Sequence, residues 1–168
     1  EGRLHQLITF SGAVAEGEVK IFNPNQSLHA IYSIKDQKKR GEEKIYYNAS
    51  LESPQIKLCL YWDDDMIQGM VKTWYPSGKP ESQREFNQNK KHGTSVACYE
   101  NGDVMLIEEY DRDLLITGSY FKPKDDTPIS QIEQGKGIAT LYTFNGIFLK
   151  KINYEKGKPK IDEEPLLR

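Results

Sequence analysis

The fold of this chain is decided by two matching stretches, Gly69-Met-Val-Lys-Thr-Trp-Tyr-Pro-Ser-Gly78 and Gly93-Thr-Ser-Val-Ala-Cys-Tyr-Glu-Asn-Gly102. Each begins with a glycine, continues as a short run that favours β-structure, and ends in a turn sequence whose glycine tolerates a positive φ. A second run follows each turn, from Pro80 to Phe86 and from Val104 to Tyr110. Each stretch therefore predicts one β-hairpin.

The same pattern recurs along the chain as aligned columns. The starting glycines are Gly17, Gly41, Gly69, Gly93 and Gly137. Five positions later come Phe22, Tyr46, Trp74, Cys98 and Tyr142, and seventeen positions later come Ile34, Leu58, Phe86, Tyr110 and Tyr154. Nine positions after the glycines come Gln26, Ser50, Gly78, Gly102 and Gly146. Columns that stay in phase over this length predict a structural repeat.

A lone hairpin is only marginally stable in water, so the repeats must pair edge to edge or stack. We therefore expect an all-β fold, an elongated antiparallel array of stacked β-hairpin repeats forming a single sheet or a solenoid. The expected parts are a partial repeat over 1–16, repeats near 17–40, 41–68, 69–92, 93–117 and 137–156, an inserted loop over 122–134, and a C-terminal tail or cap over 157–168. In the second repeat, eleven residues instead of seven separate Leu58 from Gly69, which predicts a longer or bulged hairpin arm.

The pattern of a glycine, four residues, an aromatic residue, tyrosine, two residues and a second glycine resembles the variant membrane occupation and recognition nexus (MORN) repeat of many bacterial proteins. The resemblance covers most of 17–154 and is strongest over 69–110. It implies an array of β-hairpins. Some bacterial members are labelled antitoxin-like, and eukaryotic relatives are associated with scaffolding and with lipid. The resemblance implies no catalytic residues.

Length and charge exclude several classes of protein. The chain has 168 residues, 23 Lys and Arg against 25 Asp and Glu, and a formal net charge of -2. One domain or one short repeat array fits this length. No stretch is basic enough to follow a phosphate backbone, so we do not expect nucleic acid as a partner, and the same balance disfavours a lipid surface. The chain begins at Glu1 within a partial repeat, so we interpret it as a piece of a longer protein and leave its localisation open.

No catalytic, cofactor-binding or metal-binding residue is predicted. His5, His29 and His92 have no second ligand at metal spacing, and Asp63 to Asp65 fit solvated turns. Cys59 and Cys98 are too far apart for a CxxC site, and we expect both to be small buried residues. The Asp111-Arg112-Asp113 sequence is the only feature that would suggest a metal-dependent hydrolase or transferase. We therefore expect a protein that is not an enzyme and carries no cofactor.

The candidate partner-binding residues are Lys38, Lys39, Lys90, Lys91, Tyr47, Tyr75 and Tyr99. The lysine pairs precede Gly41 and Gly93, with the three aspartates in the slot between them. These charged bands either select a charged partner or discourage aggregation of sheet edges. The tyrosines directly follow the aromatic column, so they form either part of the core or a protein-binding face.

We expect a non-catalytic protein-binding or scaffolding module whose partner is another protein. The alternatives are a module that associates with a membrane or lipid surface, and an antitoxin-like partner of a toxin. Self-association through the end strands is a further expectation, because an open repeat array leaves unpaired edges.

Overall fold

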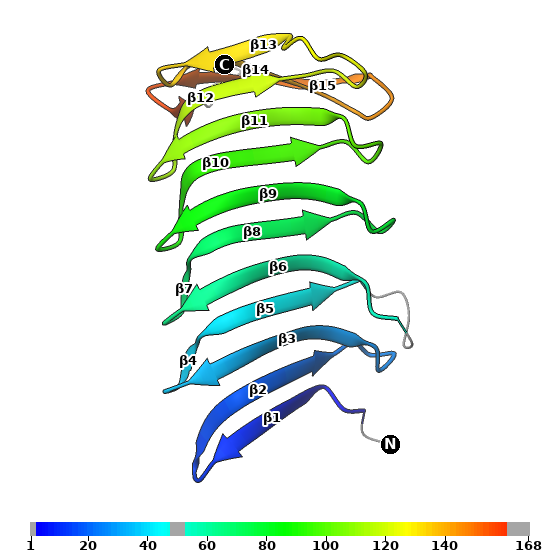
Figure 1. The fold of residues 1–168 in the computed structure, drawn as a ribbon, viewed down its shortest axis with the longest axis vertical. Helices are drawn as coiled ribbons and strands as arrows, with labels where there is room; N and C mark the ends of the chain where they lie inside the picture. The colour runs from blue at the N-terminus through cyan, green and yellow to red at the C-terminus, as the bar shows by residue number, and fades with distance from the viewer. Residues whose placement is uncertain (1–2, 48–52, 161–168) are drawn as a thin grey trace, which may run out of the picture. The chain divides into compact units, whose positions relative to one another are not determined.

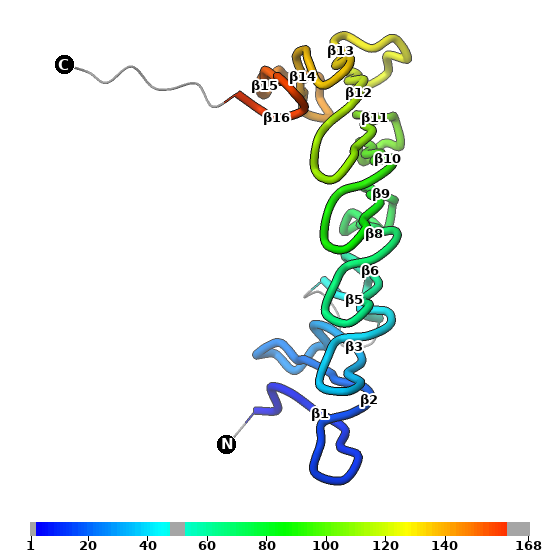
Figure 2. The backbone as a smooth tube through the Cα atoms, turned by 90° about the vertical axis from the view of Figure 1, so that its left-hand side faces the viewer, coloured from blue at the N-terminus to red at the C-terminus, as the bar shows by residue number. Residues whose placement is uncertain are grey.

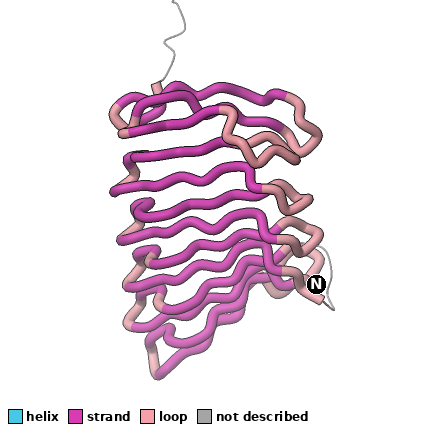
Figure 3. Tube along the Cα trace, turned by 45° about the horizontal axis from the view of Figure 1, so that its top comes forward, coloured by secondary structure: helices cyan, strands magenta, loops and turns pink. Residues whose placement is uncertain are grey.

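The computed structural model describes residues 3–47 and 53–160. These residues form sixteen strands in one open antiparallel sheet, and they contain no helix (Figure 3). The expected all-β array of hairpins is confirmed. No helix in the described ranges is long and apolar enough to cross a membrane. The chain divides into two compact units, Glu1–Lys91 and His92–Arg168, which are described separately.

The first unit is a meander in which each long strand pairs with the previous one (Figure 1). The two-residue strands β4 and β7 pair with β3 and β6. The bounds are β1 (Gln6–Ser11), β2 (Val14–Phe22), β3 (Leu28–Lys35), β4 (Lys38–Lys39), β5 (Gly41–Tyr46), β6 (Ile56–Asp63), β7 (Met66–Ile67), β8 (Gly69–Trp74) and β9 (Pro80–Asn87).

The second unit has the strand order β10-β11-β12-β13-β14-β15-β16. Its first strand starts in the last residues of the first unit. The bounds are β10 (Lys90–Cys98), β11 (Val104–Asp111), β12 (Leu114–Tyr120), β13 (Ser130–Glu133), β14 (Lys136–Tyr142), β15 (Phe148–Glu155) and β16 (Lys158–Pro159).

The first arm of each repeat ends at the predicted aromatic column. A β-bulge lies at this point in every repeat, for example between Thr73 and Trp74 and between Ala97 and Cys98. The next residue opens the loop: the N–H of Tyr99 donates to the carbonyl of Asp103, and the N–H of Gly102 donates back to Tyr99. Loops starting at Asn23, Tyr75 and Thr143 repeat these two bonds. Gly102 has a φ of 98°, so the turn position predicted from sequence does need a left-handed backbone.

The register of the second repeat differs from the prediction. Gly41 pairs with Trp62, whereas Leu58 pairs with Ile45. The four additional residues therefore lie in the hairpin loop, where the N–H of Tyr47 donates to Gln55, and not between Leu58 and Gly69. Counting a fixed seventeen positions from the starting glycine does not detect a longer loop. In this repeat the residue paired with the glycine lies at Trp62 and not at Leu58. Ser50, aligned with the turn glycines, lies outside the described residues.

The polar connections between repeats are themselves tight hairpin turns. Both central residues have positive φ in the turns Asp36-Gln37, Asp64-Asp65, Gln88-Asn89 and Arg112-Asp113. This is the geometry of a type I′ turn, whose twist matches that of the flanking strands. Tight turns therefore connect the repeats from β2 to β12, whereas 121–129 forms a longer connection between β12 and β13.

The expected inserted loop over 122–134 is only partly a loop. Its last residues form β13, which pairs with β12 through Gly118 and Ile132. The turn Gln134-Gly135 then leads into β14. The prediction of a loop over this whole range was wrong. Two prolines and several charged residues in 122–134 indicate a loop, and a strand of only four residues gives a weak signal beside them.

The second unit contains a compact core of five buried residues: Tyr110, Leu115, Tyr120, Ile132 and Ala139. In the edge-on view, β14, β15 and β16 curl back from β12 and β13 (Figure 2). Backbone bonds hold this curl: Gly135 donates to Ile116 at 2.8 Å, Gly157 donates to Gly135 at 2.9 Å, and Leu115 donates to Gly157 at 3.0 Å. A Cβ on Gly135 would lie 2.5 Å from the Gly157 nitrogen, so only glycine fits this crossing.

Candidate protein-binding surface

The predicted tyrosine ladder links successive hairpins. Tyr99 is 1% exposed, and its hydroxyl donates to the carbonyl of Phe121 at 2.8 Å. The hydroxyl of Tyr47 likewise donates to the carbonyl of Trp74 at 2.7 Å. Trp74 lies in the following repeat, and Phe121 directly follows β12, the strand after the hairpin that contains Tyr99. Burial raises the pKa of Tyr99, in keeping with a phenol that is withdrawn from solvent.

Tyr75 occupies the equivalent loop position, is half-buried, and makes the same two backbone bonds as Tyr99. All three tyrosines therefore lie at the start of hairpin loops, one residue beyond the strands. The structure uses Tyr47 and Tyr99 to join repeats, and Tyr99 has almost no surface left for a partner.

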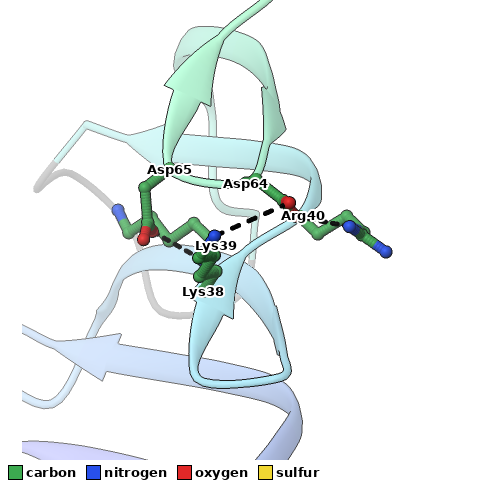
Figure 4. Close-up of polar contacts among 5 residues, drawn as sticks. All are labelled: Lys38, Lys39, Arg40, Asp64 and Asp65. Carbon is green, nitrogen blue, oxygen red and sulfur yellow. Dashed lines mark hydrogen bonds and ion pairs between the residues drawn. The ribbon is translucent and has the colours of Figure 1, made fainter.

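The basic residues Lys38 to Arg40 contact the acidic residues Asp64 and Asp65 (Figure 4). Asp64 accepts from the guanidinium of Arg40, including a 3.1 Å bond from Nε, and lies 3.7 Å from the ammonium of Lys38. The hydrogen bond from Arg40 lowers the pKa of Asp64. Asp65 closes the contact, because its carboxylate accepts from the Lys39 N–H at 2.7 Å. These contacts link the residues after one tight turn to the next tight turn, Asp64-Asp65.

An equivalent link between tight turns occurs at Asn89, without a charged side chain. The side-chain oxygen of Asn89 accepts from the Ile67 N–H at 2.6 Å, and the Asn89 N–H donates to the Ile67 carbonyl at 3.0 Å. Asp65 and Lys39 make the equivalent pair of bonds. The repeated feature is an Asp or Asn at the second turn position. This spacing is visible in the sequence, and the predicted turn over Asp63 to Asp65 does contain the tight turn Asp64-Asp65.

Lys39 is enclosed by aromatic and acidic side chains. Its ammonium lies 4.1 Å from the ring centre of Tyr32 and 4.8 Å from that of Trp62. It also forms a 2.9 Å ion pair with Glu43, which is 6% exposed and accepts a second hydrogen bond from the Trp62 indole. Such cation–π and charge-assisted contacts stabilise a partly desolvated lysine. Lys39 is therefore half-buried and held by contacts within the first unit.

The second predicted lysine pair lies at the end of the first unit. Lys90 is exposed beside the turn Gln88-Asn89, and Lys91 is half-buried. Of the seven candidate residues, Lys38 and Lys90 keep the most exposed charged groups.

The residues considered for metal chemistry are dispersed. Across 3–47 and 53–160, no group of three or more His, Cys, Asp or Glu is placed to hold a metal ion. Asp111 lies 3.3 Å from the His92 imidazole, and Asp113 forms part of a tight turn. Cys59 is half-buried and donates to Glu42 at 3.2 Å, and burial raises its pKa to about 11.

Sequence reasoning missed an exposed apolar hairpin end in the second unit. Phe144, Ile147, Phe148 and Leu149 lie at the β14–β15 turn and are between 52% and 65% exposed. The Phe148 ring meets Tyr142 edge-on at 6.0 Å, and the ammonium of Lys122 lies 4.8 Å from the Tyr142 ring centre. The signal was the run Ile147-Phe148-Leu149, which breaks the alternation expected of a half-buried strand.

A shallow depression of about 380 Å³ lies on the same unit, over β14, β15 and β16. Lys136, Tyr154, Glu155 and Lys160 contribute to its walls, and Lys160 pairs with Glu155 at 2.6 Å. Phe144, Ile147, Phe148 and Leu149 are the most exposed of the large apolar side chains in the described part of the second unit.

Comparison of the chain with protein-family models found no match, and comparison with curated proteins found none either.

Proposed function

We propose that this chain is a non-catalytic protein-binding or scaffolding module, and that it binds its partner through the β14–β15 hairpin end. The observation that carries the proposal is the exposure of Phe144, Ile147, Phe148 and Leu149 on one short hairpin. Large apolar side chains exposed together at one place mark interaction sites in many proteins.

The chemistry of the hairpin end supports a protein partner. Aromatic side chains are enriched at protein interfaces, where they bury a large area at a low cost in side-chain entropy. By contrast, the tyrosines and lysines that the sequence singled out are largely engaged within the repeats. The resemblance to MORN-type repeats points in the same direction through its scaffolding and antitoxin-like members.

A lipid surface is the second candidate, and one observation favours it. Lys150 and Lys151 are exposed directly beside the apolar residues. Apolar side chains flanked by lysines also suit the boundary between anionic headgroups and acyl chains. The net charge of -2 for the whole chain disfavours general attraction to such a surface.

The test is affinity capture from native cell extract with the full chain, compared with a Phe144→Ser/Ile147→Ser variant. The matched control is Leu7→Ser/Phe10→Ser, which removes two similarly exposed apolar side chains from β1. Circular dichroism establishes that all three chains are folded. We expect a stoichiometric protein, identified by mass spectrometry, that the hairpin variant loses and the control retains.

Two outcomes would overturn the proposal. A protein captured equally by all three chains would place the interface elsewhere. Co-flotation with vesicles of phosphatidylcholine and phosphatidylserine, abolished in the hairpin variant and unaccompanied by a captured protein, would establish the lipid reading.

A further inference from the structure

The outer edge of β15 carries backbone groups that β16 covers only in part. β16 pairs with Tyr154 and Glu155, and the N–H of Lys160 donates to the Asn153 carbonyl at 2.7 Å. Backbone groups in an antiparallel strand alternate between the two edges. The N–H and C=O of Lys151 therefore point to the same edge as the Asn153 carbonyl. Within the part of the chain that the structure describes, no strand pairs with this edge from Phe148 to Ile152.

The side chains along this edge have a definite character. Phe148 and Leu149 are 52% and 56% exposed, and Lys150 and Lys151 follow them in the strand. No ion pair joins either lysine to a carboxylate of the described residues. From Lys136 to Lys160 the chain has six lysines and one glutamate, although its net charge is -2. The edge is therefore apolar at its start and cationic at its centre.

The other open edge lacks this selectivity. β1 in the first unit also exposes large apolar side chains, Leu7 and Phe10, but its sequence Gln-Leu-Ile-Thr-Phe-Ser contains no charged residue. Charge therefore favours one class of partner at β15 and none at β1.

We propose that β15 accepts an extended, acidic segment of a partner protein as an added strand. This inference rests on the proposed protein-binding function and specifies its partner and mode. Main-chain hydrogen bonds along the edge would supply affinity, and alternate side chains would supply specificity. Successive residues point to opposite faces of a sheet, so Lys150 and Lys151 require two consecutive acidic residues opposite them. Apolar residues next to that acidic pair would cover Phe148 and Leu149.

The probe is a fluorescein-labelled peptide, Thr-Val-Asp-Glu-Val-Thr-Val, with binding followed by fluorescence anisotropy on the full chain. We expect saturable binding that a Lys150→Glu/Lys151→Glu variant weakens by about tenfold or more. A peptide with Lys-Lys in place of Asp-Glu should bind that variant and not the original chain. The control Lys72→Glu/Lys79→Glu, an equal change of charge at exposed positions in the first unit, should bind the acidic peptide normally.

A second probe tests strand addition itself. The same acidic peptide, N-methylated at alternate residues, keeps its side chains but cannot donate along one edge. We expect it to lose binding, and we expect amide exchange over 148–152 to slow only with the unmethylated peptide. Equal binding of both peptides would overturn the proposed mode.

Three other results would also overturn this inference. The first is failure of the acidic peptide to bind while affinity capture still yields a partner, which would leave the proposed function intact. The second is binding only to a chain ending at Lys160, which would make the chain's own acidic sequence Asp162-Glu163-Glu164 the occupant. The third is binding to phosphatidylserine vesicles without peptide binding, which would overturn both proposals.

Discussion

Replacement of Tyr99 by Phe isolates the link between two hairpins of the second unit. The substitution removes only the hydroxyl that donates to the Phe121 carbonyl at 2.8 Å, from a side chain that is 1% exposed. A buried hydrogen bond of this kind contributes about 1 kcal/mol to the free energy of unfolding. Replacement by Ala also removes the ring, and we expect it to cost about 3 to 5 kcal/mol. An alanine variant at this position would therefore report on folding and not on binding.

The assay is urea unfolding at 25 °C, followed by circular dichroism and tryptophan fluorescence. A slope of about 2 kcal/mol per molar urea converts the loss of 1 kcal/mol into a midpoint shift of about 0.5 M. Both tryptophans, Trp62 and Trp74, lie in the first unit, so a difference between the two signals would separate the units. The control is Tyr61→Phe, because that side chain is 50% exposed and should change the midpoint little.

The reasoning would be refuted if Tyr99→Phe unfolded at the same urea concentration as the original chain and Tyr99→Ala lost less than about 1 kcal/mol. Such a result would show that the hydrogen bond and the buried ring of Tyr99 do not contribute to the free energy of unfolding.

Three further predictions concern the packing. Lys39→Met should lower the free energy of unfolding by about 2 kcal/mol, because it leaves the buried Glu43 without its cation, whereas Lys38→Met should change it by less than about 0.5 kcal/mol. Chemical denaturation compares the two variants, and equal effects would show that the contacts of Lys39 with Tyr32, Trp62 and Glu43 do not stabilise the fold. Gly135→Ala should destabilise the chain by about 1 to 3 kcal/mol more than Gly146→Ala. The two glycines have similar φ values of 73° and 77°, but only the new methyl group at position 135 would meet backbone atoms. Thermal unfolding compares the two variants, and similar midpoints would contradict the close backbone contact between Gly135 and Gly157. Cys59, with its pKa raised to about 11, should react with iodoacetamide at pH 8 about tenfold more slowly than an unstructured peptide thiol. The rate should increase as the pH rises, because more of the thiol is then ionised. Peptide mass spectrometry follows the reaction, and a rate equal to that of the peptide would refute the burial of this thiol.

The sequence predicted the parts of the fold that depend on neighbouring residues. Turn glycines and the β-favouring runs on either side of them predicted the hairpins. The structure adds that the first arms end at the column that contains Trp74 and Cys98. These features are local, because a positive φ and a two-residue side-chain alternation are properties of a few successive residues. The type I′ turns between repeats have an equally local signal in their Asp and Asn residues.

Contacts between hairpins could not be predicted in the same way. The Asp64 contacts with Lys38 and Arg40 join residues at least 24 positions apart, and their existence depends on the register that the loop after Tyr47 imposes. The same long-range geometry converts the expected loop around Ile132 into a strand.

The amino-acid pattern alone predicts an all-β chain of repeated hairpins with glycine at the turns, because these features follow from local backbone sterics. Only the tertiary structure decided which conspicuous residues remain on the surface. It buried Tyr99 and paired Lys38 and Arg40 with Asp64, and it left Phe144 and the edge of β15 exposed. The physical reason is that exposure and charge pairing depend on register and strand curl, which sum contacts from residues far apart in the chain.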